Sequence, residues 1–246
     1  MSLPFHLVPS LTGVSSGSVV AVEGDEAHHA VAVRRLRVGE QVVLTDGLGT
    51  SASGLVSSTG RRVFEVAVSS VSSAPAPSPS VVVVQALPKG DRGELAVEML
   101  TEVGVMSIVP WAAARCVAAW RGERAAKSLA RWRSTALQAA KQARRPWFPA
   151  VEELASTSDV AALLGSVDLA VVLHESASVP LASLPVPPTG LVAVVVGPEG
   201  GLTDDEVASF VAAGAQSVRL GAEVLRTSTA GVAAVSALLA RTPRWG

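Results

Sequence analysis

The chain has 246 residues, of which 49% are hydrophobic and 17% are charged, and its formal net charge is −1. This length allows one large domain or two small ones, and the hydrophobic content is enough to fill their cores. No apolar run approaches the roughly 18 residues of a membrane span, and the N-terminus lacks the pattern of a signal peptide. We therefore expect a cytoplasmic protein. The single cysteine, Cys116, excludes an internal disulfide, and the four histidines show no ligand spacing, so we expect no metal.

The first seventy residues contain short apolar runs separated by glycine and serine, a pattern typical of a small β-barrel. One helical turn is expected at residues 26–33, and Arg34, Arg35 and Arg37 follow it. From the residues alone, these arginines either solvate the edge of the barrel or contact a polyanion. The predicted strands are 5–8, 18–22, 41–45, 52–56 and 63–71.

Residues 74–80, APAPSPS, are predicted to be a linker, because proline at alternate positions holds the chain extended and excludes helix. We therefore expect one domain at 1–73 and a second at 81–246. In the second domain, buried strands alternate with helices, which predicts an α/β fold with a parallel sheet and ligands at the carboxyl ends of its strands. The strands are expected at 81–86, 107–109, 168–173, 191–196 and 217–220. The helices are expected at 92–103, 122–143, 159–164 and 204–214, and a last helix is expected to be capped by Thr227 or Ser228 and filled by residues 230–240.

Residues 191–206, LVAVVVGPEGGLTDDE, predict a strand, a glycine loop and a helix. Thr203 and Glu206 have the spacing of a capping box, so the helix should begin at Asp204. The loop lacks the motifs of phosphate and dinucleotide sites, and its acidic residues would repel a polyphosphate. A ligand such as S-adenosylmethionine fits better, although the same residues also suit an ordinary turn before a helix. Gly200 would let the backbone approach this ligand, and a valine there should fill the ligand space without disturbing the fold.

Positive charge is concentrated between Trp111 and Trp147, where nine of the twenty basic residues and one acidic residue, Glu123, give a charge of +8. Such a segment forms a solvated face or contacts a polyanion. Three tryptophans, Trp120, Trp132 and Trp147, lie among these charges and either stack on bases or belong to the core.

The paired stretches GPEGGLTDDE and LGAEVLRTSTA resemble the signature of the RsmE family, the 16S rRNA uracil-N3 methyltransferases of the SPOUT superfamily. Four further stretches agree with the family in the same order: HHAVAVRRLRVGE, ALPKGDRGELAVEMLTEVGV, ARCV and AAKQARRPWFPAV. The resemblance implies a PUA-like β-barrel followed by a SPOUT domain with a C-terminal trefoil knot and a homodimer through that domain. The activity it implies is methylation of N3 of a uridine in 16S rRNA of the small ribosomal subunit, with S-adenosylmethionine as cofactor.

The resemblance also implies which residues form the site. Cofactor binding is expected from Leu173, His174, Glu175, Gly197, Glu199, Gly200, Leu220, Leu225, Thr227, Ser228 and Thr229, on the segments 173–175, 197–201 and 220–229 that would form the knot. RNA binding is expected from Arg34, Arg35, Arg37, Lys89, Arg92, Arg115, Lys141, Arg144 and Arg145.

Arg226 and Glu199 are the expected catalytic residues. Uracil N3–H must lose its proton as the methyl group arrives, and Arg226 would stabilise the negative charge that develops. From the residues alone, Arg226 could instead pair with Glu223 or Glu199. Many family members have glutamate where Ser228 stands, so any role of that glutamate as a base is absent here or moves to Glu199 or Glu175.

Three alternatives remain open at this point. The chain could be a non-catalytic RNA-binding protein, a nucleotide-dependent oxidoreductase, or a SPOUT methyltransferase that acts on another RNA. The glycine loops disfavour the first, since RNA binding alone does not need them, and the missing G-x-G-x-x-G disfavours the second.

Overall fold

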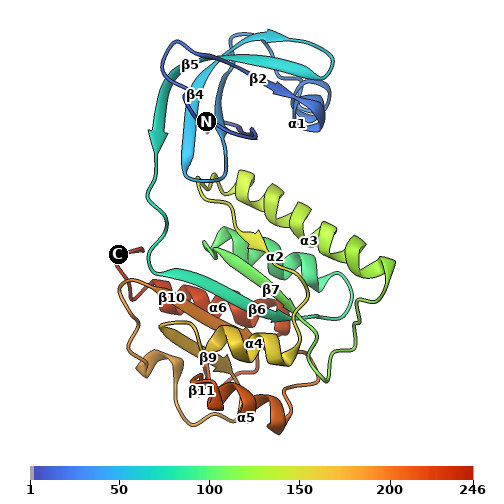
Figure 1. Cartoon of the computed structure of the whole chain (residues 1–246), viewed down its shortest axis with the longest axis vertical. Coiled ribbons are helices and arrows are strands. Elements are labelled where there is room, and N and C mark those ends of the chain that lie inside the picture. Colours follow the sequence, from blue (N-terminus) through green and yellow to red (C-terminus); the bar gives the residue numbers. More distant parts are fainter. Residues whose placement is uncertain (1–2, 246) are drawn as a thin grey trace. The chain divides into compact units, whose positions relative to one another are not determined.

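The computed structural model describes residues 3–245, which divide into two compact units (Figure 1). The first unit comprises the residues up to Ala76 together with Ala140–Phe148, and the second runs from Pro77 to Ala139 and from Pro149 onward. The division falls inside the proline-rich segment 74–80. The return of Ala140–Phe148 to the first unit was not predicted.

The first unit is built on a five-stranded sheet with the order β1-β3-β4-β5-β2, and this confirms the five predicted strands. β1 is parallel to β3, and the other pairs are antiparallel. No hydrogen-bonded ladder joins β1 to β2 within residues 3–245, so hydrogen bonding does not close the expected barrel there. The helical turns α1 (Gly24–His28) and η1 (His29–Val33) add Ala27 and Ala30 to the same core. The strands are β1 (Phe5–Leu7), β2 (Val19–Glu23), β3 (Gln41–Thr45), β4 (Thr50–Thr59) and β5 (Val63–Ser73).

A buried polar cluster lies beside this core. His6 Nδ1 is 3.1 Å from Glu26 Oε1, and Lys141 Nζ donates to Glu26 Oε2 at 2.8 Å. Burial alone would raise the pKa of Glu26, but its bonds to His6 and Lys141 outweigh burial and lower that pKa below its ordinary value. The Lys141 side chain is only 11% exposed. Lys141 lies in the last turn of helix α3 (Glu123–Gln142) and belongs to the first unit, so this cluster lies within that unit.

The second unit contains a six-stranded sheet with the order β11-β9-β10-β6-β7-β8, in which every pair is parallel, as predicted. Two elements were missed, β8 and the 3-10 turn Leu181–Ser183, because two or three residues produce no periodicity. The strands are β6 (Ser80–Ala86), β7 (Ser107–Trp111), β8 (Ala150–Val151), β9 (Leu169–Leu173), β10 (Leu191–Val196) and β11 (Gln216–Val218). The helices besides α3 are α2 (Arg92–Glu102), α4 (Thr157–Leu164), α5 (Asp204–Ala212) and α6 (Thr227–Leu239).

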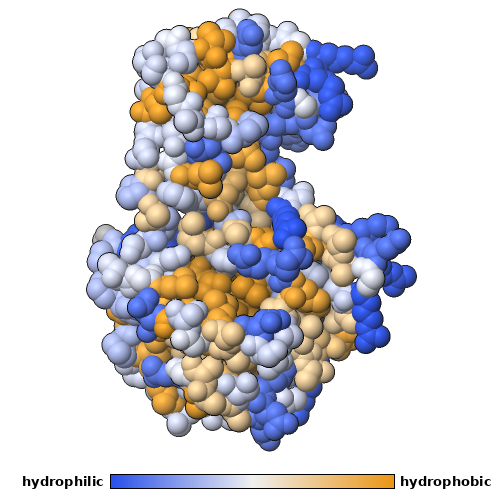
Figure 2. Space-filling view, viewed as in Figure 1, coloured by the Kyte–Doolittle hydropathy of each residue, from blue (hydrophilic) through white to orange (hydrophobic). Residues whose placement is uncertain are grey.

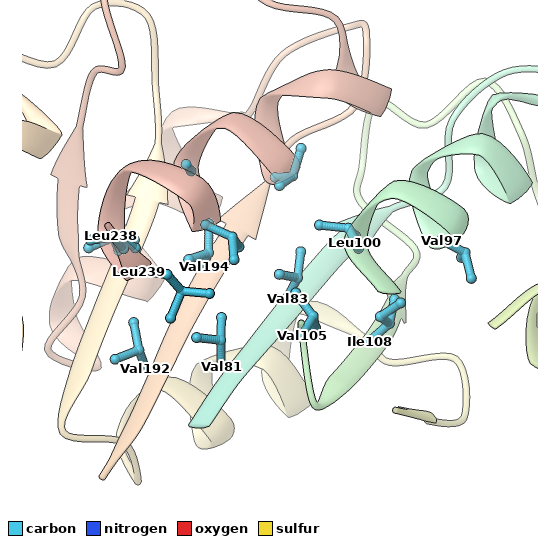
Figure 3. Packing of buried hydrophobic residues seen from close by; sticks show 14 of the residues in the cluster. Val81, Val83, Val97, Leu100, Val105, Ile108, Val192, Val194, Leu238 and Leu239 are labelled. Atoms are coloured by element: carbon cyan, nitrogen blue, oxygen red, sulfur yellow. The ribbon is translucent and has the colours of Figure 1, made fainter. Parts of the chain in front are cut away.

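Helices cover both faces of this sheet. Residues of β6 alternate between two cores, with Val81 and Val83 in one and Val82 and Val84 in the other. The first core is shared with α2, α3 and α6, and the second with α4 and α5. Hydrophilic residues gather at the surface over the amino-terminal end of α3 (Figure 2), whereas the side chains between the sheet, α2 and α6 are apolar (Figure 3).

Trp132 belongs to this core and is 3% exposed. It packs edge-on against Trp120 with ring centroids 5.0 Å apart, so the structure favours the core position for both tryptophans over base stacking.

No helix within residues 3–245 is both long enough and apolar enough to cross a membrane.

Glu26→Gln is expected to destabilise the protein in a pH-dependent way. Because the pKa of Glu26 is lower in the folded state than its ordinary value of 4.5, its carboxylate stabilises the fold above that pH, and the contribution is lost as pH falls through the folded pKa. The variant should lose roughly 1.5–3 kcal/mol of unfolding free energy at pH 7, and its deficit should shrink below about pH 4.5. Urea denaturation between pH 3 and 7 measures both effects.

Asp25→Asn is the control, since the Asp25 side chain is 98% exposed. Its unfolding free energy should stay close to that of the wild type at every pH. A Glu26→Gln deficit that does not change with pH would contradict the assignment.

Candidate active site

The carboxyl ends of the parallel strands meet at one edge of the sheet. Val195 of β10 is in register with Val172 of β9 and with Val84 of β6, and Ser217 of β11 is in register with Val172. The segments that follow β9, β10 and β11 therefore leave the sheet side by side. The structure thus brings together the three predicted segments, 173–175, 197–201 and 220–229.

The segment after β9 is tied to the segment after β11. His174 N donates to Val218 O at 2.9 Å, and Arg219 N donates to Val179 O at 3.0 Å. Leu181 N in turn donates to Arg219 O at 2.9 Å. These backbone bonds hold the two connections together beyond the ends of the strands.

The glycine loop after β10 is fixed by a buried carboxylate. Glu206 is 4% exposed, and its Oε2 accepts from Thr203 N at 2.9 Å while its own N–H donates to Thr203 Oγ1 at 3.2 Å. This confirms the predicted capping box and the helix start at Asp204. Glu206 Oε1 also accepts from Ala114 N at 2.8 Å, a bond that the sequence did not indicate. The carboxylate therefore joins the start of α5 to the chain beyond β7.

Gly200 packs directly on the neighbouring Arg115. Arg115 Nη1 donates to the carbonyl oxygens of Gly200 at 3.4 Å and Leu202 at 3.1 Å. A Cβ atom at Gly200 would lie 2.9 Å from the Arg115 carbonyl oxygen, closer than such atoms approach. The expectation that valine at position 200 would only fill ligand space is therefore wrong, because its side chain would collide with the backbone of Arg115. Arg115, expected to contact RNA, is exposed and holds this loop.

The segment between β11 and α6 exposes backbone donors. Within residues 3–245, no acceptor is bonded to the backbone N–H groups of residues 220–226. Arg226 takes the N-cap position expected for Thr227 or Ser228, so helix α6 begins at Thr227. Both of those residues are buried, at 7% and 4% exposure.

The Arg226 side chain is exposed at the start of α6. Across the described part of the chain it forms no hydrogen bond or ion pair, so the pairing with Glu223 or Glu199 that the residues left open does not occur there. Its guanidinium can therefore meet a substrate without first leaving a carboxylate.

An open pocket of about 560 Å³ lies beside Glu199. Glu199 Oε1 accepts from the backbone N of Lys89 at 3.2 Å, which places the carboxylate next to the start of α2. The pocket brings together one expected catalytic residue, Glu199, and two expected RNA contacts, Lys89 and Arg92. Its lining is Lys89, Gly90, Asp91, Arg92, Leu95 and Glu199.

The remaining expected RNA contacts lie in the first unit. Arg34, Arg35, Arg37 and Arg144 are exposed. Arg145 is buried at 8% exposure and Lys141 is bonded to Glu26, so the structure gives these two residues interior positions instead of the exposed ones expected.

In the region covered by residues 3–245, no group of three or more His, Cys, Asp or Glu side chains is arranged to hold a metal ion.

Gln85 is a residue at this edge that sequence reasoning missed. It is fully buried at the end of β6, and its Nε2 donates to Ala86 O at 3.1 Å and Thr227 O at 3.4 Å. Its Oε1 has no partner in the described structure. The sequence did carry a signal for this residue, because Gln85 is a single polar residue at the end of the apolar run SVVVVQA.

Comparison with known proteins gives the family. Residues 75–239, more than half of the chain, match the family model described as an RNA methyltransferase domain, and residues 22–68 match an RNA methyltransferase PUA domain. The ribosomal RNA small subunit methyltransferase E of Mycobacterium tuberculosis is 45% identical over 238 residues, covering 94% of this chain and 89% of that protein. The chain belongs to the ribosomal RNA small subunit methyltransferase E family. The Bacillus subtilis member is 30% identical, with 93% of each chain covered.

Solved structures agree with this membership of the methyltransferase E family. The family member from Neisseria gonorrhoeae bound to S-adenosyl methionine superposes with a TM-score of 0.86 at 27% identity and covers 97% of both chains. A Legionella pneumophila protein described as a putative methyltransferase, in complex with the same cofactor, gives 0.89 at 27% identity and covers 98% of this chain and 99% of that one.

Glu206→Gln is expected to destabilise the second unit. The amide would keep one acceptor oxygen but place an NH2 group against the second backbone N–H, leaving a buried donor unpaired. The expected loss is roughly 1–3 kcal/mol of unfolding free energy, measured by urea denaturation at pH 7. Asp205→Asn, in the same helical turn but exposed, should cost less than about 1 kcal/mol, because it weakens only the interaction with the helix dipole. Equal losses in the two variants would contradict the role assigned to Glu206.

Proposed function

We propose that the protein transfers a methyl group from S-adenosylmethionine to N3 of a uridine in 16S rRNA of the small ribosomal subunit. One observation carries the proposal: in a methyltransferase E family chain, the segments after β9, β10 and β11 leave one edge of the sheet side by side. Such an edge is where ligands of parallel α/β sheets bind.

The chemistry of these segments fits the cofactor. The unbonded N–H groups of residues 220–226 suit the polar groups of an adenosine, and the carboxylates of Glu175, Glu199 and Glu223 suit a sulfonium and an ammonium group. When bound, S-adenosylmethionine supplies an electrophilic methyl group. The residues that would hold it are Leu173, His174, Glu175, Gly197, Glu199, Gly200, Leu220, Leu225, Thr227, Ser228 and Thr229.

Arg226 and Glu199 would act on the acceptor base. N3 of uracil must give up its proton as its new bond to carbon forms, and Glu199 would receive that proton. One Glu199 oxygen already accepts from Lys89 N, which orients the carboxylate and leaves the other oxygen available. The unpaired Arg226 would stabilise the negative charge on the uracil carbonyl oxygens. Ser228 is buried in the first turn of α6, which supports giving the acid–base role to Glu199.

RNA would be held by exposed cations in each unit. Arg34, Arg35, Arg37 and Arg144 would contact phosphates from the first unit, and Lys89, Arg92 and Arg115 from the second. Arg35 and Arg144 have positive φ angles of 57° and 54°, a strained conformation for residues other than glycine. Such strain concentrates at functional sites, which supports the assignment of both arginines.

The trefoil knot and the homodimer also belong to this proposal. The backbone bonds between the connection after β9 and the chain after β11 support a threaded C-terminal segment. Exposed apolar side chains on that segment, Val224 at 80% and Leu225 at 41% exposure, support a subunit interface in the knotted unit. The cytoplasm, where ribosomal subunits are assembled, is the proposed location.

Methyl transfer to unmodified small ribosomal subunits tests the function. Subunits are incubated with labelled S-adenosylmethionine, and their RNA is then digested to nucleosides and analysed by mass spectrometry. The proposal expects label in 3-methyluridine from 16S rRNA. Label only in another RNA would favour the alternative substrate, and RNA binding without any transfer would favour a non-catalytic protein.

Arg226→Ala is expected to lower the single-turnover rate by about 10²–10³, the range for loss of one oxyanion donor. Arg226→Lys should recover part of this loss, because lysine keeps the charge but lacks the planar fork of donors. Calorimetric affinity for S-adenosylmethionine should change little in either variant.

Arg219→Ala is the matched control, an exposed arginine on the same connection, and it should turn over at close to the wild-type rate. Weak cofactor binding by Arg226→Ala, with normal turnover at saturation, would instead assign Arg226 to the cofactor site.

A further inference from the structure

The cations of α3 differ in whether they have partners. Arg131 Nη2 donates to Glu94 Oε2 at 3.0 Å, and Arg133 Nη2 donates to Glu153 Oε1 at 2.9 Å. Arg121, Arg124 and Lys127, at the amino-terminal end of the helix, are exposed. Their side chains form no hydrogen bond or ion pair with any residue from 3 to 245. The positive charge available to a partner therefore lies at the start of the helix.

The unpaired Arg124 and Lys127 lie on the same face of α3 as the paired Arg131 and form a row with it. Arg124, Lys127 and Arg131 recur at spacings of three and four residues, which places them on the same side of a helix. The helical rise puts Lys127 about 6 Å from Arg131 along the axis and Arg124 about 4.5 Å further. Figure 2 shows a strongly hydrophilic surface over the amino-terminal end of α3, which is the right-hand end of that helix in Figure 1.

The other end of the row lies next to the pocket beside Glu199. Arg131 bonds to Glu94 in the first turn of α2, and a Cβ atom at Gly93 would lie only 2.8 Å from Trp132 Nε1, so the two helices pack closely there. The same turn of α2 begins with Arg92, which lines the pocket. The row therefore starts at the helix that borders the candidate active site and extends away from it.

We propose that Arg121, Arg124 and Lys127 form a second RNA-contact surface, which binds the phosphate backbone of RNA flanking the target nucleotide. The inference rests on the proposed function. One carboxylate, Glu123, lies among these three cations, and the positive end of the helix dipole adds to their potential.

The contacts would be to phosphates and not to bases. Trp120 and Trp132 are the aromatic side chains nearby in sequence, and they pack against each other, so neither ring is offered for base stacking. Phosphate contacts position an RNA without reading its sequence. Arg131 and Arg133 would first have to leave their carboxylates, so they should contribute much less to binding.

Two double variants with equal charge change on the same helix test this surface. Arg124→Ala with Lys127→Ala removes unpaired cations, and Arg131→Ala with Arg133→Ala removes paired ones. Affinity for 16S rRNA is measured between 0.05 and 0.3 M salt. The first variant should reduce the slope of log affinity against log salt by about 1.4, and affinity at 0.1 M by about 25-fold, if two phosphate contacts are lost. The second should reduce the slope by less than half as much.

Circular dichroism and S-adenosylmethionine titration should be unchanged in both variants. Equal slopes in the two variants would show that only net charge matters. An unchanged slope in the Arg124→Ala, Lys127→Ala variant would show that these cations are solvated. Either result overturns the inference. If the wild type binds no RNA, the inference and the proposed function both fail. If it binds RNA with the expected slopes but transfers no methyl group, the proposed function fails and the surface stands.

Discussion

The arrangement of the second unit depends on the place of β10 between β9 and β6. All six residues of β10 pair with β6, and four of them also pair with β9. Because the strand is apolar and paired on both sides, it cannot shift register without breaking two ladders and moving buried valines to the opposite core. This fixed register sets where the glycine loop emerges, and it places that loop beside the ends of β9 and β11.

Polar side chains then hold the loops against the sheet. The hydrogen-bond partners of the charged side chains show which of them stabilise the structure and which are available to a ligand. Glu206 and Arg115 bond to backbone groups and keep the glycine loop in place. Lys141 and Arg131 are likewise committed to carboxylates. Arg226 lacks such a partner among the described residues, as do the cations at the start of α3. A cation free of intramolecular carboxylates loses no existing pair when a substrate arrives, which supports the assignment of these residues to RNA.

Apolar periodicity and helix-capping residues predicted much of this structure. The apolar run of β10 and the capping box of Thr203 and Glu206 depend on residues close in the chain, and both were found where expected. The partners of Lys141 and Arg115 were not predictable, because each bond joins residues more than eighty positions apart. Gly200 shows the same limit: the sequence indicated a close approach at this glycine, but it did not indicate that the backbone of Arg115 packs there.

The central claim is that the segments after β9, β10 and β11 form one cofactor site. Hydrogen–deuterium exchange with and without S-adenosylmethionine tests it directly, because each segment contains backbone N–H groups whose exchange a bound ligand would slow. The claim predicts joint protection of residues 173–175, 197–201 and 220–229, with little change at the opposite edge around β8. Protection of only one of these segments, or protection centred elsewhere in the chain, would contradict it.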